Sequence, residues 1–182
     1  MSSQPRVAKV LAALLVSMTA GAIVLMVLGN NPPSAGPFCL SAYYRLGPVD
    51  RVVRSRAGQS PDRWNRIEIF FSGTKSGSLR ELEAARGPSG AADLNCHFIV
   101  CNGNGGSDGE IQATEKWQRQ WSVKPNRTWQ GTERTIRICL IGDGASAPPT
   151  DYQLKRLELL LEALCRKFHV AAESVYLPQD CE

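Results

Sequence analysis

The sequence predicts an α/β layer fold, in which helices flank a mixed central sheet, preceded by one N-terminal transmembrane helix. Three observations lead to this prediction. Apolar runs of strand length at residues 67–71, 96–101 and 136–141 alternate with helical patterns. Residues 150–168 carry apolar side chains at helical spacing. Residues 10–28 hold no charge, and a helix of that length spans about 30 Å, the thickness of a bilayer core.

The charges around residues 10–28 predict the orientation of this anchor. Arg6 and Lys9 precede the apolar run, and no acidic residue follows until Asp50. By the positive-inside rule, the N-terminus is cytoplasmic and the body extracytoplasmic, on a single-pass protein of the cell membrane. A cleaved signal peptide is the alternative, because residues 20–22 (AGA) fit a small-residue cleavage site. Both alternatives export the body.

The chain therefore divides into four predicted parts, which are a cytoplasmic tail at 1–9, the anchor at 10–28, a linker and unassigned segment at 29–63, and an α/β domain at 64–182. The formal charge of the whole chain is +4, and removing the two basic residues before the anchor leaves 19 basic and 17 acidic residues. A body with so small an excess of positive charge is not expected to bind nucleic acid.

Local signals define the helices and the main turn of the body. Ser78 and Glu81 fit a capping box for a short helix over residues 78–86, and Thr150 and Gln153 fit one for the long helix. The Gly-rich stretch 102–109 lacks the lysine of a phosphate loop and predicts a turn between two strands. The long helix is expected to pack on the sheet through one apolar stripe, formed by Leu154, Leu157, Leu161, Leu164 and Phe168.

Cysteine usage agrees with export. The chain has six cysteines, and all of them follow the apolar run: Cys39, Cys96, Cys101, Cys139, Cys165 and Cys181. An even number in an exported chain predicts at least one disulfide. A structural zinc site that uses His97 is the rival. It is disfavoured because strand alternation predicts that Cys96 and Cys101 face opposite sides of the sheet.

An ordered set of motifs resembles a known family. The segments are NCHFIVCNGNGGSDGEI at 95–111, Trp117 with Gln120, ICLIGDG at 138–144, the start of the long helix, and WNRIEIFFSGT at 64–74. Together they resemble the zinc amidases that cleave the bond between muramic acid and L-alanine in peptidoglycan, a family that includes the peptidoglycan recognition proteins. The resemblance covers roughly residues 64–178.

The resemblance also indicates that the zinc ligands of the family are missing. A catalytic zinc needs three protein ligands and an open position for water. Phe70 stands where the family has its first histidine ligand, Phe71 where it has the neighbouring histidine, and Pro178 where it has the second ligand. Cys96 matches the family's catalytic tyrosine, and Cys181 is the one candidate for a third ligand. We therefore expect no zinc and no other cofactor.

The groove of the family would be lined here by six matched positions, which are Phe70, Phe71, Thr74, Cys96, His97 and Pro178. Of the two histidines, His97 is expected to be hydrogen-bonded within the fold, and His169 to lie at the C-terminus of the long helix. The expected function is non-catalytic binding of peptidoglycan fragments or of an envelope protein. The alternatives are an active amidase with a rearranged site and a purely structural envelope protein.

Overall fold

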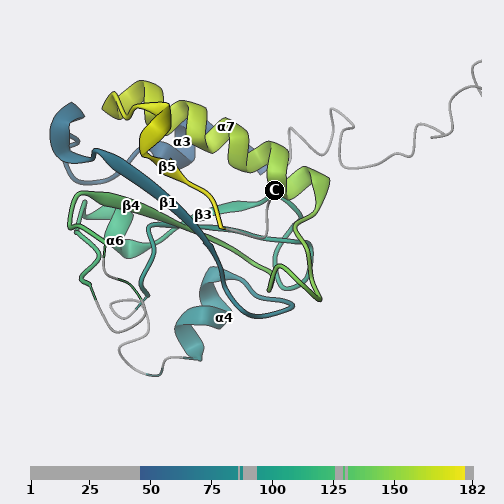
Figure 1. Cartoon of the computed structure of the whole chain (residues 1–182). Helices are drawn as coiled ribbons and strands as arrows, with labels where there is room; N and C mark the ends of the chain where they lie inside the picture. The colour runs from purple at the N-terminus through teal and green to yellow at the C-terminus, as the bar shows by residue number, and fades with distance from the viewer. Residues whose placement is uncertain (1–45, 86, 88–93, 126–128, 130, 179–182) are drawn as a thin grey trace, which may run out of the picture. The chain divides into compact units, whose positions relative to one another are not determined.

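The computed structural model describes residues 46–85, 87, 94–125, 129 and 131–178. Figure 1 shows these residues as a sheet with helices on both sides. In chain order the elements are α3 (Val49–Val53), η1 (Pro61–Arg63), β1 (Arg66–Phe71), α4 (Leu79–Ala84), β2 (Phe98–Val100), β3 (Ile111–Ala113), α6 (Glu115–Gln118), β4 (Thr135–Leu140), α7 (Asp151–Phe168), η3 (Ala172–Ser174) and β5 (Val175–Tyr176).

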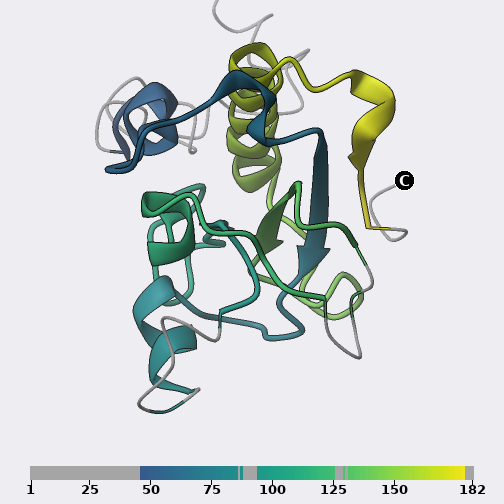
Figure 2. The same cartoon turned by 90° about the vertical axis from the view of Figure 1, so that its left-hand side faces the viewer.

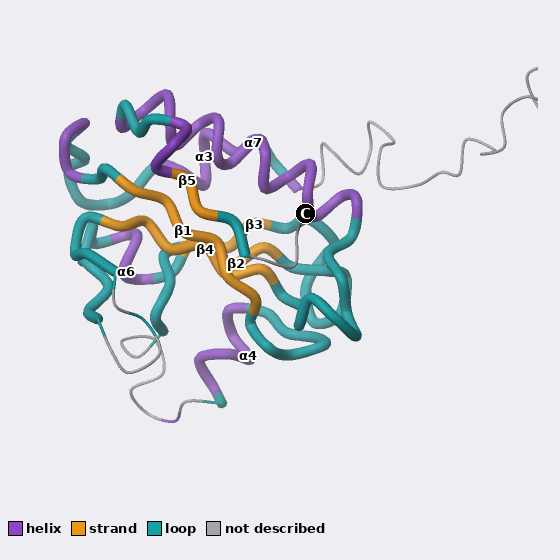
Figure 3. The backbone as a smooth tube through the Cα atoms, viewed as in Figure 1, coloured by secondary structure: helices purple, strands orange, loops and turns teal. Residues whose placement is uncertain are grey.

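The strands of the described part of the chain form one five-stranded sheet in the order β3-β2-β4-β1-β5. Strand β1 pairs in parallel with β4 and β5, and β2 pairs in parallel with β4 and antiparallel with β3. The predicted mixed central sheet flanked by helices is therefore confirmed (Figure 3). Parallel pairing puts the amino ends of β1, β2 and β4 together and their carboxyl ends together, so loops from these strands meet in space.

Helix α7 covers one face of the sheet together with α3, which we call the α7 face (Figures 1 and 2). Its predicted capping box is confirmed. The Thr150 hydroxyl accepts from the Gln153 backbone N–H at 2.9 Å, and the Gln153 side chain accepts from the Thr150 N–H at 3.3 Å. The helix ends at His169, which adopts a left-handed conformation with φ of 54° at the C-cap. Helix α3 lies within the segment for which the sequence predicts no element.

The apolar stripe of α7 differs from the prediction. Leu157, Leu164 and Phe168 are buried, but Leu154 and Leu161 are only half-buried, and Leu160 is fully buried instead. The helix is rotated because two polar residues also face the sheet. The Gln153 amide donates to the carbonyls of Val100 at 2.8 Å and Ile141 at 3.0 Å, and Arg156 Nε donates to the Gly109 carbonyl at 3.2 Å. These hydrogen bonds satisfy backbone carbonyls at or near the ends of strands. The spacing of apolar residues in the sequence does not reveal such partners.

Helix α4 lies on the opposite face, which we call the α4 face. The helix forms where it is predicted, but its predicted capping box is wrong, since Ser78 makes no side-chain cap hydrogen bond. The Leu79 N–H instead donates to the Gln112 side chain of β3 at 2.7 Å. A tertiary partner therefore replaces the local cap and ties α4 to the edge strand.

The stretch 102–109 joins β2 to β3 as an antiparallel hairpin, which confirms the predicted turn. Glycine is required at its end. Gly109 has φ of 70°, and an added Cβ would lie 2.8 Å from Arg156 Cγ and 2.9 Å from Tyr152 Cδ1. The hairpin thus approaches α7 more closely than a side chain at this position would permit.

The N-terminal predictions concern residues outside the described part of the chain. The anchor at 10–28, the cytoplasmic tail and the first part of the linker all precede residue 46. Among the residues that are described, no helix combines the length and the apolar character needed to cross a bilayer.

Candidate functional site

The α4 face carries the positions that the resemblance assigns to the family groove. Phe70 from β1 packs there against a cluster of buried residues, namely Leu94, Cys96, Ile99, Cys101, Cys139 and Ile141. The alternation of strand side chains sends Phe71 to the other face, where it packs against the α7 core. The structure therefore brings Phe70 and Cys96 together and separates Phe71 from them.

Two further groove positions lie at the carboxyl ends of the strands. Thr74 is exposed in the loop after β1, and its hydroxyl hydrogen bonds with that of Ser72 at 2.8 Å. Pro178 is half-buried and follows β5 by two residues. The last register pair of β5 joins Tyr176 to Glu68, two residues before Pro178 and Phe70 respectively.

Arg137 occupies the centre of the α4 face. It is the register partner of Glu68 and is only 6% exposed, although it carries a charge. Its guanidinium lies 3.4 Å from a Glu68 carboxylate oxygen and donates to the Asn95 carbonyl at 2.8 Å. The same group stacks over the Phe70 ring at 4.0 Å to the ring centroid. Burial lowers the pKa of Arg137 and Glu68 opposes that shift, but an arginine stays protonated in either case.

Trp129 packs against both Arg137 and Glu68. Its ring lies 4.6 Å from the Arg137 guanidinium, its indole N–H donates to Glu68 at 2.6 Å, and the residue is only 5% exposed. Gly131 makes room for the ring, because an added Cβ would lie 2.2 Å from a Trp129 ring carbon. We call Glu68, Phe70, Trp129 and Arg137 the Arg137 cluster. It covers the middle of the face with a cation held between two aromatic rings.

His97, which is also a matched groove position, lies inside the molecule rather than in an open groove. The residue is fully buried, with Trp64 and Trp117 at ring-centroid distances of 4.9 and 6.0 Å. Its Nδ1 accepts from the Arg137 backbone N–H at 2.9 Å, and its Nε2 therefore donates to the Trp121 carbonyl at 2.9 Å. Burial lowers the pKa of His97 to about 4. A neutral histidine with both nitrogens engaged has no lone pair left for a metal.

The four described cysteines take part in no disulfide. Cys96 and Cys101 share the α4 face with Cys139, so the prediction that the first two face opposite sides is wrong. The chain bends at His97 before β2 begins, and the bend resets the alternation. Burial raises the pKa of the Cys101 thiol to about 12, which makes it a poor nucleophile. Cys39 and Cys181 lie outside the described residues, and a disulfide that involves them stays a prediction.

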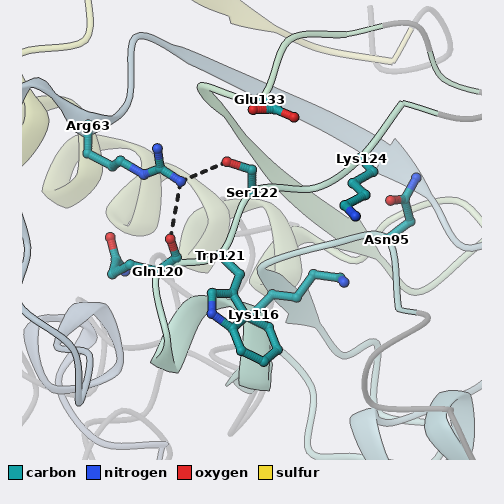
Figure 4. A pocket seen from close by; sticks show the side chains of 8 residues that line it. All are labelled: Arg63, Asn95, Lys116, Gln120, Trp121, Ser122, Lys124 and Glu133. Atoms are coloured by element: carbon teal, nitrogen blue, oxygen red, sulfur yellow. Dashed lines mark hydrogen bonds between the residues drawn. The ribbon is translucent and has the colours of Figure 1, made fainter.

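A pocket of about 650 Å³ opens at the amino ends of the strands (Figure 4). It is lined by Arg63, Asn95, Lys116, Gln120, Trp121, Ser122, Lys124 and Glu133. Sequence reasoning missed this pocket and the Arg137 cluster. The one available signal for the cluster was an arginine inside the apolar run 136–141, because a charge in a central strand needs a buried partner.

In the described ranges, no three His, Cys, Asp or Glu side chains converge in a way that could hold a metal ion. The matched positions Phe70 and Pro178 offer no donor atom to a metal. The donor set that zinc requires is therefore not assembled by these residues.

Comparison with known proteins identifies the family. The solved structure of PGRP-Hd from Alvinella pompejana is similar at a TM-score of 0.46 and 15% sequence identity, over 71% of this chain and 81% of that chain. No curated protein matches the chain. The N-acetylmuramoyl-L-alanine amidase family matches residues 49–178, which is more than half of the sequence. The chain therefore belongs to the N-acetylmuramoyl-L-alanine amidase family.

Proposed function

We propose that this domain binds peptidoglycan without cleaving it. The observation that supports the proposal most strongly is the position of the Arg137 cluster. Arg137 lies on the same face as Phe70 and Cys96, the positions that match the family's first zinc ligand and its tyrosine, and Trp129 covers it. These side chains lie beside the positions that the resemblance assigns to the metal and its water, which supports a face without a catalytic zinc.

Electrostatics add a second argument. A divalent cation close to the Arg137 guanidinium would be repelled, and at a site of low dielectric constant that repulsion is strong. The Glu68 carboxylate already pairs with Arg137 and accepts a hydrogen bond from the Trp129 indole, so a metal would have to compete with both groups for it. Zinc hydrolysis needs a metal that polarises the carbonyl and lowers the pKa of its water. On this face the two matched positions, Phe70 and Pro178, provide no metal ligand, and the Arg137 guanidinium disfavours a bound cation.

We also propose that residues 10–28 anchor the domain in the cell membrane with the body outside, where peptidoglycan is found. The support is the uncharged run with basic residues only on its N-terminal side. Protease added to intact cells should digest the body while the first residues stay protected. A body that is found intact in the soluble cytoplasm would refute this topology.

The binding proposal is tested on the full chain with insoluble peptidoglycan and added zinc. Two readouts are needed, which are the fraction of protein that co-sediments and the peptide stems released into solution, with an active zinc amidase as the positive control. Co-sedimentation without release supports the proposal. Release of stems would instead establish an active amidase with a rearranged site. Absence of both would favour a structural role or an envelope protein as the partner.

A further inference from the structure

The pocket of Figure 4 lies at the opposite end of the strands from three of the groove positions, Phe70, Thr74 and Pro178. Arg63 precedes β1, Asn95 precedes β2 and Glu133 precedes β4, whereas Phe70 and Pro178 lie at the carboxyl ends. Arg66 and Phe70 alone are separated by about 13 Å along the strand at 3.3 Å per residue. The pocket is therefore distinct from the Phe70 end of the groove, although Asn95 adjoins Cys96, and its volume suits a ligand of one or two rings.

The charges that line the pocket are mainly positive. Arg63, Lys116 and Lys124 face a single acid, Glu133. Arg63 donates to two neutral oxygens, the Gln120 carbonyl at 3.3 Å and the Ser122 hydroxyl at 2.7 Å. Among the described residues, neither Arg63 nor Lys124 takes part in a salt bridge. The positive charges of Lys116 and Arg63 also act on buried His97, because both help to lower its pKa.

Trp121 is the aromatic side chain of this pocket. It is 47% exposed, whereas Trp64, Trp117 and Trp129 are each at most 5% exposed. The Arg119 guanidinium lies over the Trp121 ring at 4.7 Å, so cationic groups surround the indole. An exposed indole beside several cations is a suitable surface for a ring that carries a negative charge.

The backbone holds Trp121 in place rigidly. Its N–H donates to the Lys116 carbonyl at 2.9 Å, and its own carbonyl accepts from buried His97 at 2.9 Å. The preceding residue, Gln120, has φ of 54°, a left-handed conformation that is costly for a residue with a side chain. The Gln120 amide offsets that cost by bonding to the Trp64 indole at 2.9 Å and the Trp117 carbonyl at 2.9 Å. A strained residue fixed in this way presents the indole before any ligand arrives.

We propose that this pocket binds a carboxylated pyranose, with the ring face against Trp121 and the carboxylate among Lys116, Lys124 and Arg63. The apolar C–H face of a sugar ring suits an indole, and a carboxylate suits the cations. The body carries only a small positive excess, so a compact anion fits better than a long polyanion. The inference rests on the proposed function, because a carboxylated sugar comes either from muramic acid whose stem peptide has been removed from the peptidoglycan strand or from a uronic acid of another wall polysaccharide.

The test follows the indole N–H signals of the full chain by NMR. The probes are N-acetylmuramic acid and glucuronic acid, with N-acetylglucosamine and inorganic phosphate at equal ionic strength as comparators. We expect a saturable shift of the Trp121 signal with at least one carboxylated sugar, and the responding sugar identifies the source. Lys124→Glu should weaken binding at least tenfold. Lys75→Glu, a charge reversal at an exposed loop residue, is the matched control and should leave binding unchanged.

Several outcomes would overturn the assignment. They are an equal response to N-acetylglucosamine, an equal response to phosphate, unchanged binding by Lys124→Glu, or no response to either acidic sugar. Peptidoglycan co-sedimentation separates this inference from the proposed function. Retention on peptidoglycan without a sugar response leaves the proposed function standing and refutes the pocket. A sugar response without retention on peptidoglycan supports the pocket and refutes the proposed function. Unchanged signals of the three buried indoles verify that each variant is folded.

Discussion

The two faces of the sheet are built from alternating residues of the same strands, yet they differ in chemistry. On the α7 face, β1 and β4 contribute only hydrocarbon, from Ile67, Ile69, Ile136, Ile138 and Leu140, all at most 3% exposed. On the α4 face, the residues between them are Glu68, Phe70, Arg137 and Cys139. The α7 face carries the larger apolar core, whereas the α4 face combines a smaller apolar cluster with a charge pair. The predictions below test that division of roles.

The largest effect is expected on the α7 face. Leu160 is fully buried between the helix and the sheet, so Leu160→Ala should lower the free energy of unfolding by about 3–5 kcal/mol through lost burial and a residual cavity. Chemical unfolding followed by tryptophan fluorescence measures this loss. The adjacent Leu159 is 38% exposed, and Leu159→Ala serves as the control, with an expected change within about 0.5 kcal/mol. Equal losses for both variants would contradict the placement of α7.

His97 is fully buried against Trp64 and Trp117 of the α7-face core, and its contribution to the free energy of unfolding should depend on pH. Its pKa is about 4 in the folded chain against 6.5 in the unfolded chain, so the unfolded chain binds the proton first as pH falls. The contribution of neutral His97 to the free energy of unfolding is fully present above pH 6.5 and is lost progressively as the pH falls to 4. The total loss is about 3 kcal/mol.

The measurement is the free energy of unfolding as a function of pH, compared between wild type and His97→Gln. The variant cannot titrate, so the difference between the two curves isolates His97 from the carboxylates. Parallel curves between pH 6.5 and 4 would show that His97 is not buried as a neutral ring.

A smaller loss is expected from the Arg137 cluster. Glu68→Leu leaves the buried guanidinium without its carboxylate and should cost about 2 kcal/mol, which is below the usual range because water reaches the 18% exposed Glu68 side chain. The double variant Glu68→Leu with Arg137→Met should regain more than half of that loss, since no charge is then left uncompensated. Additive losses in the double variant would mean that the two charges do not stabilise each other.

The smallest expected change comes from Gly131→Ala, which should push the Trp129 ring off Arg137 at a cost of about 1 kcal/mol. The sensitive readout is acrylamide quenching of tryptophan fluorescence. Wild type should show one accessible indole, Trp121, and the variant should show two. Unchanged quenching would indicate that Trp129 does not depend on the absence of a side chain at Gly131. Gly58→Ala, at a position with open space around it, is the control.

The contrast between the faces also explains what the sequence could predict. Strands β1 and β4, the hairpin turn and helix α7 follow from local patterns, because their apolar residues meet one core and their caps are local. The pairing of β5 and the five-residue helix α3 could not be predicted, since neither is long enough to carry a periodic signal. The cap of α4 depends on Gln112, which is distant in sequence.

The candidate site was predicted only in part, for a similar reason. The positions of Phe70 and Pro178 came from a motif, and they explain which ligands a metal would lack. The residues that fill the face instead, Arg137 and Trp129, meet only through the pairing of β1 with β4 and the path of the loop before β4. The pocket around Trp121 likewise depends on a left-handed conformation at Gln120, which its sequence context does not reveal.

The most direct test of the central claim is the zinc content of the folded full chain. The protein is dialysed to equilibrium against a small excess of zinc near neutral pH, and bound metal is measured by elemental analysis alongside an active amidase of the same family. Because the Arg137 guanidinium lies over the Phe70 ring and neither Phe70 nor Pro178 can coordinate a metal, we predict far less than one zinc per chain. One tightly bound zinc per chain, lost on unfolding, would contradict the account.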